Sequence, residues 1–167
     1  MKFPKLFFKK LLIGILLIAG CAGASLALKD FVDSLNPEVT LPILEVRCAF
    51  TTPIVNGDGS AERSLFRANY SWMFITGIKE GKGMELQGLS LYPTTLPPNV
   101  PLLFQFSTEP EKVTIDRADG LYGPDFVNIM GDVSSPQQPG VYCYRIQADF
   151  ERGSILYYLA VRVDDIA

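Results

Sequence analysis

The residues of this chain that could do chemistry are acids and cysteines, because histidine is absent from all 167 positions. This absence removes the commonest general base, the commonest zinc ligand and every nucleophile system that depends on an imidazole. Acidic residues are densest around Asp116, Asp119 and Asp125. Clustered carboxylates suit calcium, but this spacing misses the EF-hand pattern, and loop aspartates mostly cap turns. We therefore expect no metal site, no cofactor and no enzymatic activity.

The three cysteines need separate explanations. Cys21 follows an apolar run directly, whereas Cys48 and Cys143 lie in the more polar remainder and form a candidate disulfide if that part is in an oxidising compartment. Side-chain alternation puts Cys48 on the apolar face of its segment and Cys143 on the face that carries Arg145 and Gln147. The alternative is one buried thiol and one half-exposed thiol.

The first 28 residues have the pattern of an export signal. Four lysines precede an uncharged, largely apolar run from Leu11 to Leu28, and Lys29-Asp30 ends that run. A cationic start followed by an apolar stretch is typical of export, and the lysines favour keeping the N-terminal end in the cytoplasm. Everything after Lys29 is therefore expected outside the cytoplasmic membrane.

Three interpretations of this segment stay open. Ile18-Ala19-Gly20-Cys21 resembles the bacterial lipobox, and the resemblance implies that Cys21 becomes the lipidated first residue of the mature protein. The run Leu11–Leu28 is also just long enough for an uncleaved anchor helix, since a span needs ~17–25 residues. Ordinary signal cleavage at Ala22-Gly23-Ala24 or Ser25-Leu26-Ala27 is the third interpretation. All three predict export.

Charge narrows the classes of partner. Four of the 15 basic residues and none of the 18 acidic residues lie in the first 28, so the remainder has a net charge of −7. A negative domain does not bind nucleic acid by neutralising phosphates, and an anionic membrane surface repels it. The remaining length suits a single domain with its own core.

Short segments of alternating hydrophobicity follow a predicted stalk at 29–41, and they predict strands. The predicted strands are Pro42–Thr51, Leu65–Thr76, Met84–Tyr92, Val100–Thr108, Lys112–Arg117, Asp125–Met130, Val141–Phe150 and Ile155–Asp164. A turn is expected at 80–83, and the prolines between 93 and 101 indicate a crossing segment outside any sheet. Many short strands with frequent turns predict an all-β, two-sheet antiparallel sandwich over 42–167.

The segment Pro139-Gly140-Val141-Tyr142-Cys143-Tyr144-Arg145-Ile146 resembles the penultimate strand of bacterial immunoglobulin-like domains. The resemblance implies an immunoglobulin-like sandwich of about 7–8 strands. It also implies that the Tyr142 ring lies in the core with its hydroxyl bonded to nearby backbone. Tyr144 would then occupy the place of the second core cysteine of those domains.

More broadly, the chain resembles uncharacterised bacterial cell-envelope proteins and lipoproteins. The resemblance rests on Asn69-Tyr70-Ser71-Trp72, on Leu103–Phe106 running into Pro110–Ile115, and on the closing hairpin. These motifs pack cores, so they imply a fold rather than an activity. Tyr70, Trp72 and Phe74 alternate along one predicted strand and are expected to face the core.

The expected function is that of a membrane-anchored extracytoplasmic binding module, whose partner is an envelope protein or a wall polymer. An envelope enzyme or accessory subunit without a recognisable active site is the alternative. Loops and edge strands are the parts of a sandwich that can meet a partner. The predicted binding loops are Thr52–Ser64 and Arg117–Pro124, and Leu121-Tyr122 is the predicted contact in the second loop, because tyrosine offers a large contact area at low entropic cost.

Overall fold

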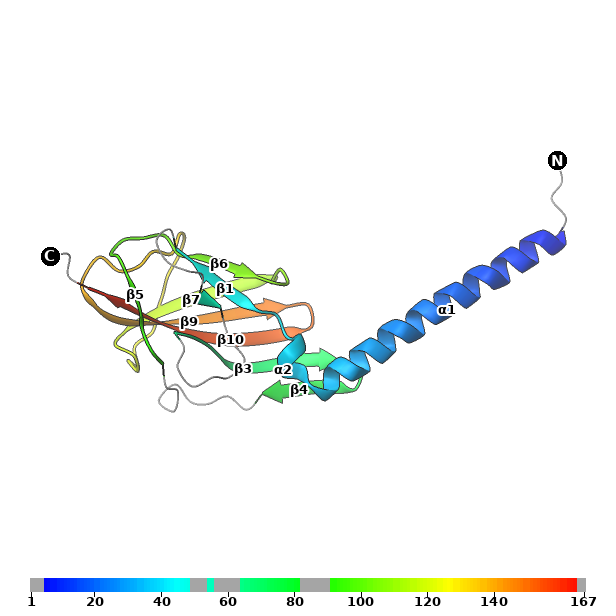
Figure 1. Cartoon of the computed structure of the whole chain (residues 1–167), viewed down its shortest axis with the longest axis horizontal. Helices are drawn as coiled ribbons and strands as arrows, with labels where there is room; N and C mark the ends of the chain where they lie inside the picture. Colours follow the sequence, from blue (N-terminus) through cyan, green and yellow to red (C-terminus); the bar gives the residue numbers. More distant parts are fainter. Residues whose placement is uncertain (1–4, 49–53, 56–63, 82–90, 165–167) are drawn as a thin grey trace.

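The structure is a computed structural model of the whole chain, and it describes residues 5–48, 54–55, 64–81 and 91–164 (Figure 1). A long helix, α1 (Lys5–Leu35), leads to a short helix, α2 (Pro37–Thr40), and then to a domain of strands. The strands are β1 (Leu44–Arg47), β2 (Ile54–Val55), β3 (Leu65–Phe74), β4 (Gly77–Gly81), β5 (Thr94–Leu96), β6 (Leu103–Phe106), β7 (Lys112–Asp119), β8 (Val127–Asn128), β9 (Gly140–Phe150) and β10 (Gly153–Val163).

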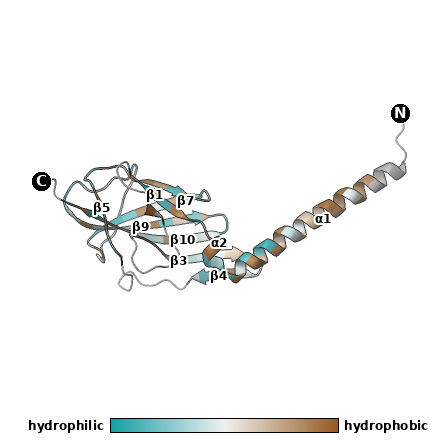
Figure 2. Ribbon diagram, in the orientation of Figure 1, coloured by the Kyte–Doolittle hydropathy of each residue, from teal (hydrophilic) through white to brown (hydrophobic). Residues whose placement is uncertain are grey.

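Helix α1 projects away from the domain and is apolar over most of its length (Figures 1 and 2). The part from Leu11 to Leu35 is long and apolar enough to cross a membrane, and none of its most apolar stretch is buried against the domain. In the predicted stalk at 29–41, the structure has the end of α1, which continues to Leu35, and then α2. Lys29 and Asp33 support this extension with an ion pair of 2.7 Å one turn apart, and no proline lies between Lys5 and Asn36.

The strands form two sheets. The smaller sheet has the order β2-β1-β6, and the larger has the order β4-β3-β10-β9-β7-β8, with β5 beside β10. Every pairing between these strands is antiparallel except that of β5 with the end of β10, which is parallel. The predicted all-β domain behind an apolar helix is confirmed, whereas a purely antiparallel arrangement is not.

One hydrophobic cluster joins the two sheets. It contains Leu44 and Val46 of β1 together with alternate residues of β9 and β10, which are almost completely buried. Phe106 of β6 contacts the rings of Phe150 and Tyr157 edge to face, at centroid distances of 6.0 and 6.2 Å. The alternation seen in the sequence therefore selects the residues that form this core.

Trp72 belongs to the same cluster, as its alternation along β3 predicted. Its side chain is 7% exposed, and its ring meets that of Phe150 edge to face at 5.5 Å. Gly153 allows this close approach of β10 to β3, because a Cβ at Gly153 would lie 2.0 Å from the Ser71 carbonyl oxygen.

A second, smaller cluster covers the other face of the large sheet and corrects the expectation for Cys143. This thiol is completely buried with Ala68, Leu91 and Ala160, although Arg145 and Gln147 on the same face of its strand are polar. Burial raises the pKa of the Cys143 thiol to about 12. Cys48 packs against the first cluster instead, and the structure contains no Cys48–Cys143 disulfide. The candidate bridge is therefore not formed, because the two thiols belong to clusters on opposite faces.

Several predicted strand limits also change. A turn lies at Ile75-Thr76, and Gly77 directly after it has a φ of +112° that favours glycine. Of the turn expected at 80–83, residues 80–81 belong to β4, and residues 82–83 fall outside the described residues. Residues 94–96 join the large sheet as β5, although the prolines around them predicted a segment outside it. The predicted strand Asp125–Met130 is shorter in the structure, where it covers only Val127–Asn128. Most of the predicted strand Met84–Tyr92 and loop Thr52–Ser64 falls outside the described residues.

The resemblance also predicted the environment of Tyr142, and this prediction is confirmed. The residue is 7% exposed, and its hydroxyl donates a hydrogen bond of 2.9 Å to the Gln138 carbonyl, four residues earlier. Tyr144 is completely buried, and its hydroxyl donates to the Ser134 carbonyl at 3.0 Å. Both tyrosines thus bury their rings and satisfy their hydroxyls with backbone oxygens.

Candidate functional site

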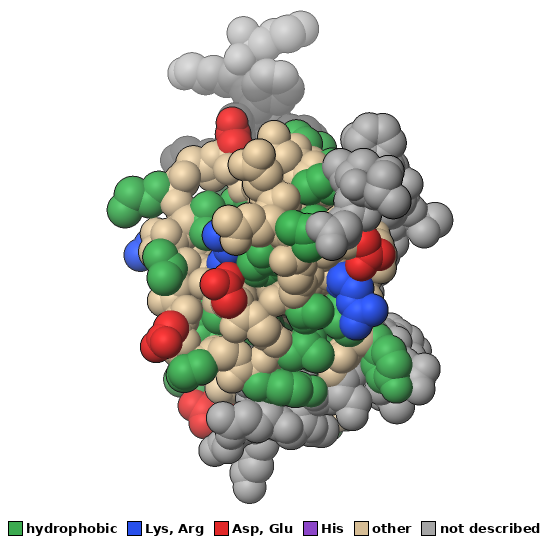
Figure 3. Space-filling view, turned by 90° about the vertical axis from the view of Figure 1, so that its left-hand side faces the viewer, with side chains coloured by type: hydrophobic (Ala, Val, Ile, Leu, Met, Phe, Trp, Pro, Cys, Tyr) green, Lys and Arg blue, Asp and Glu red, His purple; other side chains and the backbone are tan. Residues whose placement is uncertain are grey.

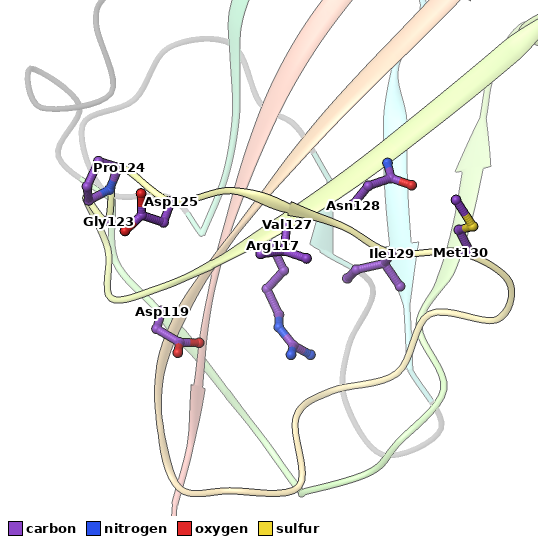
Figure 4. Close-up of a pocket in the computed structure, with 9 residues that line it drawn as sticks. All are labelled: Arg117, Asp119, Gly123, Pro124, Asp125, Val127, Asn128, Ile129 and Met130. Atoms are coloured by element: carbon purple, nitrogen blue, oxygen red, sulfur yellow. The ribbon is translucent and has the colours of Figure 1, made fainter.

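The candidate site is an open pocket between the end of β7, the loop that follows it, and β8 (Figure 4). Its volume is about 630 Å³, within the range of sites for small ligands or side chains. Arg117 and Asp119 project from the same side of β7, as expected for alternate residues of a strand. The other lining residues are Gly123, Pro124, Asp125, Val127, Asn128, Ile129 and Met130.

Two glycines shape the loop that closes one side of this pocket. Gly120 has a φ of +84° directly after β7, and its N–H donates a hydrogen bond of 2.7 Å to the Val141 carbonyl. Gly123 lies so close to the end of β7 that a Cβ there would be 2.3 Å from the Asp119 carbonyl oxygen. The tight loop therefore depends on glycine at both positions.

Arg117 is the cation of the pocket. Its guanidinium carbon lies 5.6 Å from the centre of the Tyr142 ring, a distance typical of a cation–π contact. Burial raises the pKa of the Tyr144 hydroxyl to about 12, and the charge of nearby Arg117 opposes this rise. The wall of the pocket thus places a guanidinium against buried phenol rings, where it can meet an acidic or hydrogen-bonding ligand.

An ion pair on the opposite face of β7 holds β8 in place. Arg145 donates to Asp116 Oδ2 from Nε at 3.0 Å and from Nη2 at 2.7 Å, and Asn128 Nδ2 donates to Asp116 Oδ1 at 2.8 Å. Burial disfavours the charge of Asp116, but the bonds from Asn128 and Arg145 outweigh it and hold the pKa below its usual value. Arg145 also lies over the Phe126 ring at 4.5 Å. These contacts position the strand that forms the other side of the pocket.

The rim of the pocket is apolar and accessible. Val127 is 69% exposed and Met130 is 90% exposed, although both are hydrophobic. Strand β8 is the edge of the large sheet and pairs only with β7 among the described strands. Exposed apolar side chains along a sheet edge are typical of a surface that meets a partner.

The site lies far from the helix. Strand β7 begins at Lys112, opposite Asp149 beside the β9–β10 turn, and ends at Asp119, opposite Tyr142. Seven residues of extended strand cover about 23 Å. Figure 3 shows the end of the domain opposite α1, where hydrophobic side chains lie between scattered charges of both signs.

The predicted contact residues Leu121 and Tyr122 are next to this pocket but do not line it. Leu121 is half-buried and packs against the second cluster, as Phe126 and Tyr158 also do. Tyr122 is 43% exposed. Of the two predicted contact residues, Tyr122 is therefore the exposed one, whereas the loop folds the Leu121 side chain onto the outer face of the sheet. A partner at this loop stays a prediction.

Sequence reasoning placed Arg117 at the start of a predicted binding loop without giving it a role, and it missed Val127 and Met130 as site residues. Alternation predicted a strand at β7 and a longer strand around β8 than the structure has, and it could not show that the ends of these strands enclose a pocket. The acidic residues that are densest in the sequence lie in two different places in the structure. Asp119 and Asp125 line the pocket, whereas Asp116 pairs with Arg145 behind it.

A second notable region joins α1 to the domain. Asp30 accepts hydrogen bonds from the Arg152 guanidinium and from the Ile75 backbone N–H, the latter at 2.5 Å. Arg152 also donates to the Met73 carbonyl, at 2.6 and 3.0 Å. Glu38 of α2 adds an ion pair of 2.5 Å with Arg67. The helix therefore ends in polar contacts with the β3–β4 and β9–β10 turns.

Cys21, the candidate lipidation site, is exposed in the middle of α1. The helix continues through it without interruption, and Ser25 Oγ donates to the Cys21 carbonyl at 2.9 Å. The thiol is thus accessible on the apolar helix, fourteen residues before the helix ends at Leu35.

Comparisons of this chain with models of protein families, with curated proteins and with solved structures each returned no match.

Proposed function

We propose that this protein is a membrane-anchored extracytoplasmic binding module that presents the β7–β8 pocket to a protein or polymer of the cell envelope. The observation that carries the proposal is the separation of anchor and pocket. The helix is joined to the turns at one end of the large sheet, and the pocket lies seven strand residues away. A module of this kind holds its binding surface away from the lipid.

The proposed domain is an immunoglobulin-like β-sandwich without enzymatic activity. The shared core of two sheets and the hydrogen bond from Tyr142 to Gln138 support this architecture. The pocket itself offers a stacked guanidinium, two carboxylates and an exposed methionine. Such a mixture suits the recognition of a polar partner with an apolar contact.

Membrane attachment rests on the apolar helix, and intact mass tests how it is achieved. A retained helix predicts the full-length mass in the membrane fraction, whether Cys21 is native or replaced by alanine. Lipidation predicts a shorter chain with a lipid adduct on Cys21, and Cys21→Ala then leaves an unprocessed precursor. A soluble product cleaved after Ala24 or Ala27 would contradict membrane attachment.

A photo-crosslinking residue at Met130 tests the binding function in intact cells. Met130 is 90% exposed at the pocket rim, and Lys112 is an exposed position at the other end of β7 that serves as the matched control. We expect a discrete adduct from position 130 and none from position 112, and Arg117→Ala should weaken it. The same adducts from both positions, or none from position 130, would contradict a partner site at this pocket.

A further inference from the structure

The β3–β4 turn carries exposed hydrophobic side chains at the end of the domain nearest to the helix. Ile75, Ile78 and Met73 are 63, 62 and 56% exposed. Met73 and Ile78 are paired across the two strands, and Ile75 lies in the turn between them. We call these three residues the turn patch. They face away from the core, which takes Trp72 and Phe74 from the same strand.

The turn patch has a fixed position along the axis of α1. The uncharged run of α1 ends at Leu28, and Asp30 follows two residues later, which is about 3 Å along a helix axis. Asp30 accepts the N–H of Ile75 at 2.5 Å. The backbone of the turn is therefore fixed beside the point where the apolar part of the helix ends.

Each headgroup layer of a bilayer is about 5–7 Å thick, so a turn at this height lies within it when the apolar run fills the hydrocarbon layer. Apolar side chains are favourable at the boundary between headgroups and acyl chains, where they leave water. If the turn were surrounded by water only, its three large hydrophobic side chains would stay exposed, which is unfavourable in free energy.

Beyond Leu28, α1 also exposes apolar side chains. Ala27, Asp30 and Ser34 are half-buried or buried on the side toward the domain, whereas Phe31, Leu35 and their neighbours at helical spacing are exposed. An apolar face thus continues on the side away from the domain for two further turns. Exposed apolar side chains therefore occur both on this part of the helix and on the turn that is bonded to it.

We infer that the turn patch is a second membrane contact, which inserts into the lipid interface and seats the domain on the bilayer beside its anchor. The contact is apolar and not electrostatic, because the exported part carries a net charge of −7 and an anionic surface repels it. The inference rests on the proposed membrane attachment of α1.

Quenching of tryptophan fluorescence by brominated lipids tests this contact. The full-length protein is reconstituted into phosphatidylcholine vesicles as the Ile75→Trp or Ile78→Trp variant. Val127→Trp is the matched control, because Val127 is 69% exposed but lies at the far end of the domain. Native Trp72 is common to all variants, so its emission can be subtracted.

We expect the added emission of Ile75→Trp and Ile78→Trp to be blue-shifted and mostly lost in brominated vesicles. Lipids brominated near the headgroup should quench more than lipids brominated near the chain ends, and Val127→Trp should be unaffected. Equal results in neutral vesicles and in vesicles containing phosphatidylglycerol would support an apolar contact, whereas quenching only with the anionic lipid would overturn it.

Flotation separates the two possible failures. If the protein floats with the vesicles and neither Trp variant is quenched more than Val127→Trp, the turn patch does not contact lipid and the inference is wrong. If the chain does not float at all, the proposed membrane attachment itself fails. Circular dichroism identifies a variant that has not folded, and the other Trp position then decides the question.

Discussion

Arg152 and Asp30 lie 122 residues apart in the chain and form an ion pair that joins the β9–β10 turn to the end of the long helix. Arg152 binds the Met73 carbonyl with the same guanidinium, so one side chain connects the helix with both turns at this end of the domain. Its guanidinium also lies 5.4 Å from the Phe74 ring centre. The helix is therefore fixed to the domain by polar contacts and not by a flexible tether.

Asp30→Ala should loosen this joint without unfolding the domain. A partly exposed ion pair contributes about 0–1 kcal/mol to stability, so the free energy of unfolding should change little. The distance between spin labels at Ile18 and Val127 should become more broadly distributed. Asp33→Ala is the matched control, because Asp33 pairs with Lys29 within the helix. Equal widths for both variants would show that Asp30 does not hold the helix.

The stability of the domain should depend on the ionisation of Asp116. Its pKa is lower in the folded protein than the ordinary value of 3.8, so the charge stabilises the fold above that value. This contribution is lost as the pH falls through the folded pKa. Urea unfolding followed by circular dichroism, from neutral pH to below 3.8, should show a smaller loss for Asp116→Asn than for the native chain. Asp132→Asn, at an exposed carboxylate, should keep the native slope.

Trp72→Ala should destabilise the domain by about 3–5 kcal/mol, because it leaves a cavity beside Phe150. Met73→Ala is the neighbouring control, and its side chain is 56% exposed in place of 7%. Its effect on urea unfolding in detergent should stay within about 0.5 kcal/mol. Similar losses from both changes would contradict the assignment of faces along β3.

Tyr142→Phe removes only the hydroxyl that donates to Gln138. The carbonyl then loses its partner while the ring stays in the core, so we expect a loss of about 0.5–1.5 kcal/mol in the free energy of unfolding. Tyr92→Phe, at a side chain that is 54% exposed, controls for the chemical change. No difference between the two variants would mean that this hydrogen bond adds nothing to stability.

Leu121→Ser should destabilise more than Tyr122→Ser. Leu121 packs against the second cluster and loses apolar burial, for which we expect about 1–2 kcal/mol, less than for a fully buried leucine. Tyr122 is 43% exposed and should lose less. Thermal unfolding of the two single variants separates them. If Leu121→Ser is neutral, the loop does not pack as the structure shows.

Local periodicity determined much of this fold in advance. The alternation along 141–150 and 155–163 predicted the β9–β10 hairpin and the residues that its core face buries, and it placed Trp72 inside. The apolar run after four lysines predicted an apolar N-terminal helix. These features depend on neighbouring residues alone, because a repeat of two or an unbroken apolar stretch is written in consecutive positions.

Tertiary structure alone decided what covers each face and which distant segments meet. Cys143 is buried because Leu91 and other residues from separate segments cover the polar face of its strand. The pocket exists because Arg117 and Met130 lie at the ends of strands that a glycine-dependent loop brings together. Asp30 meets Arg152 across 122 residues. Periodicity states which side chains share a face, but the burial, charge pairing and enclosure of that face depend on the path of the whole chain.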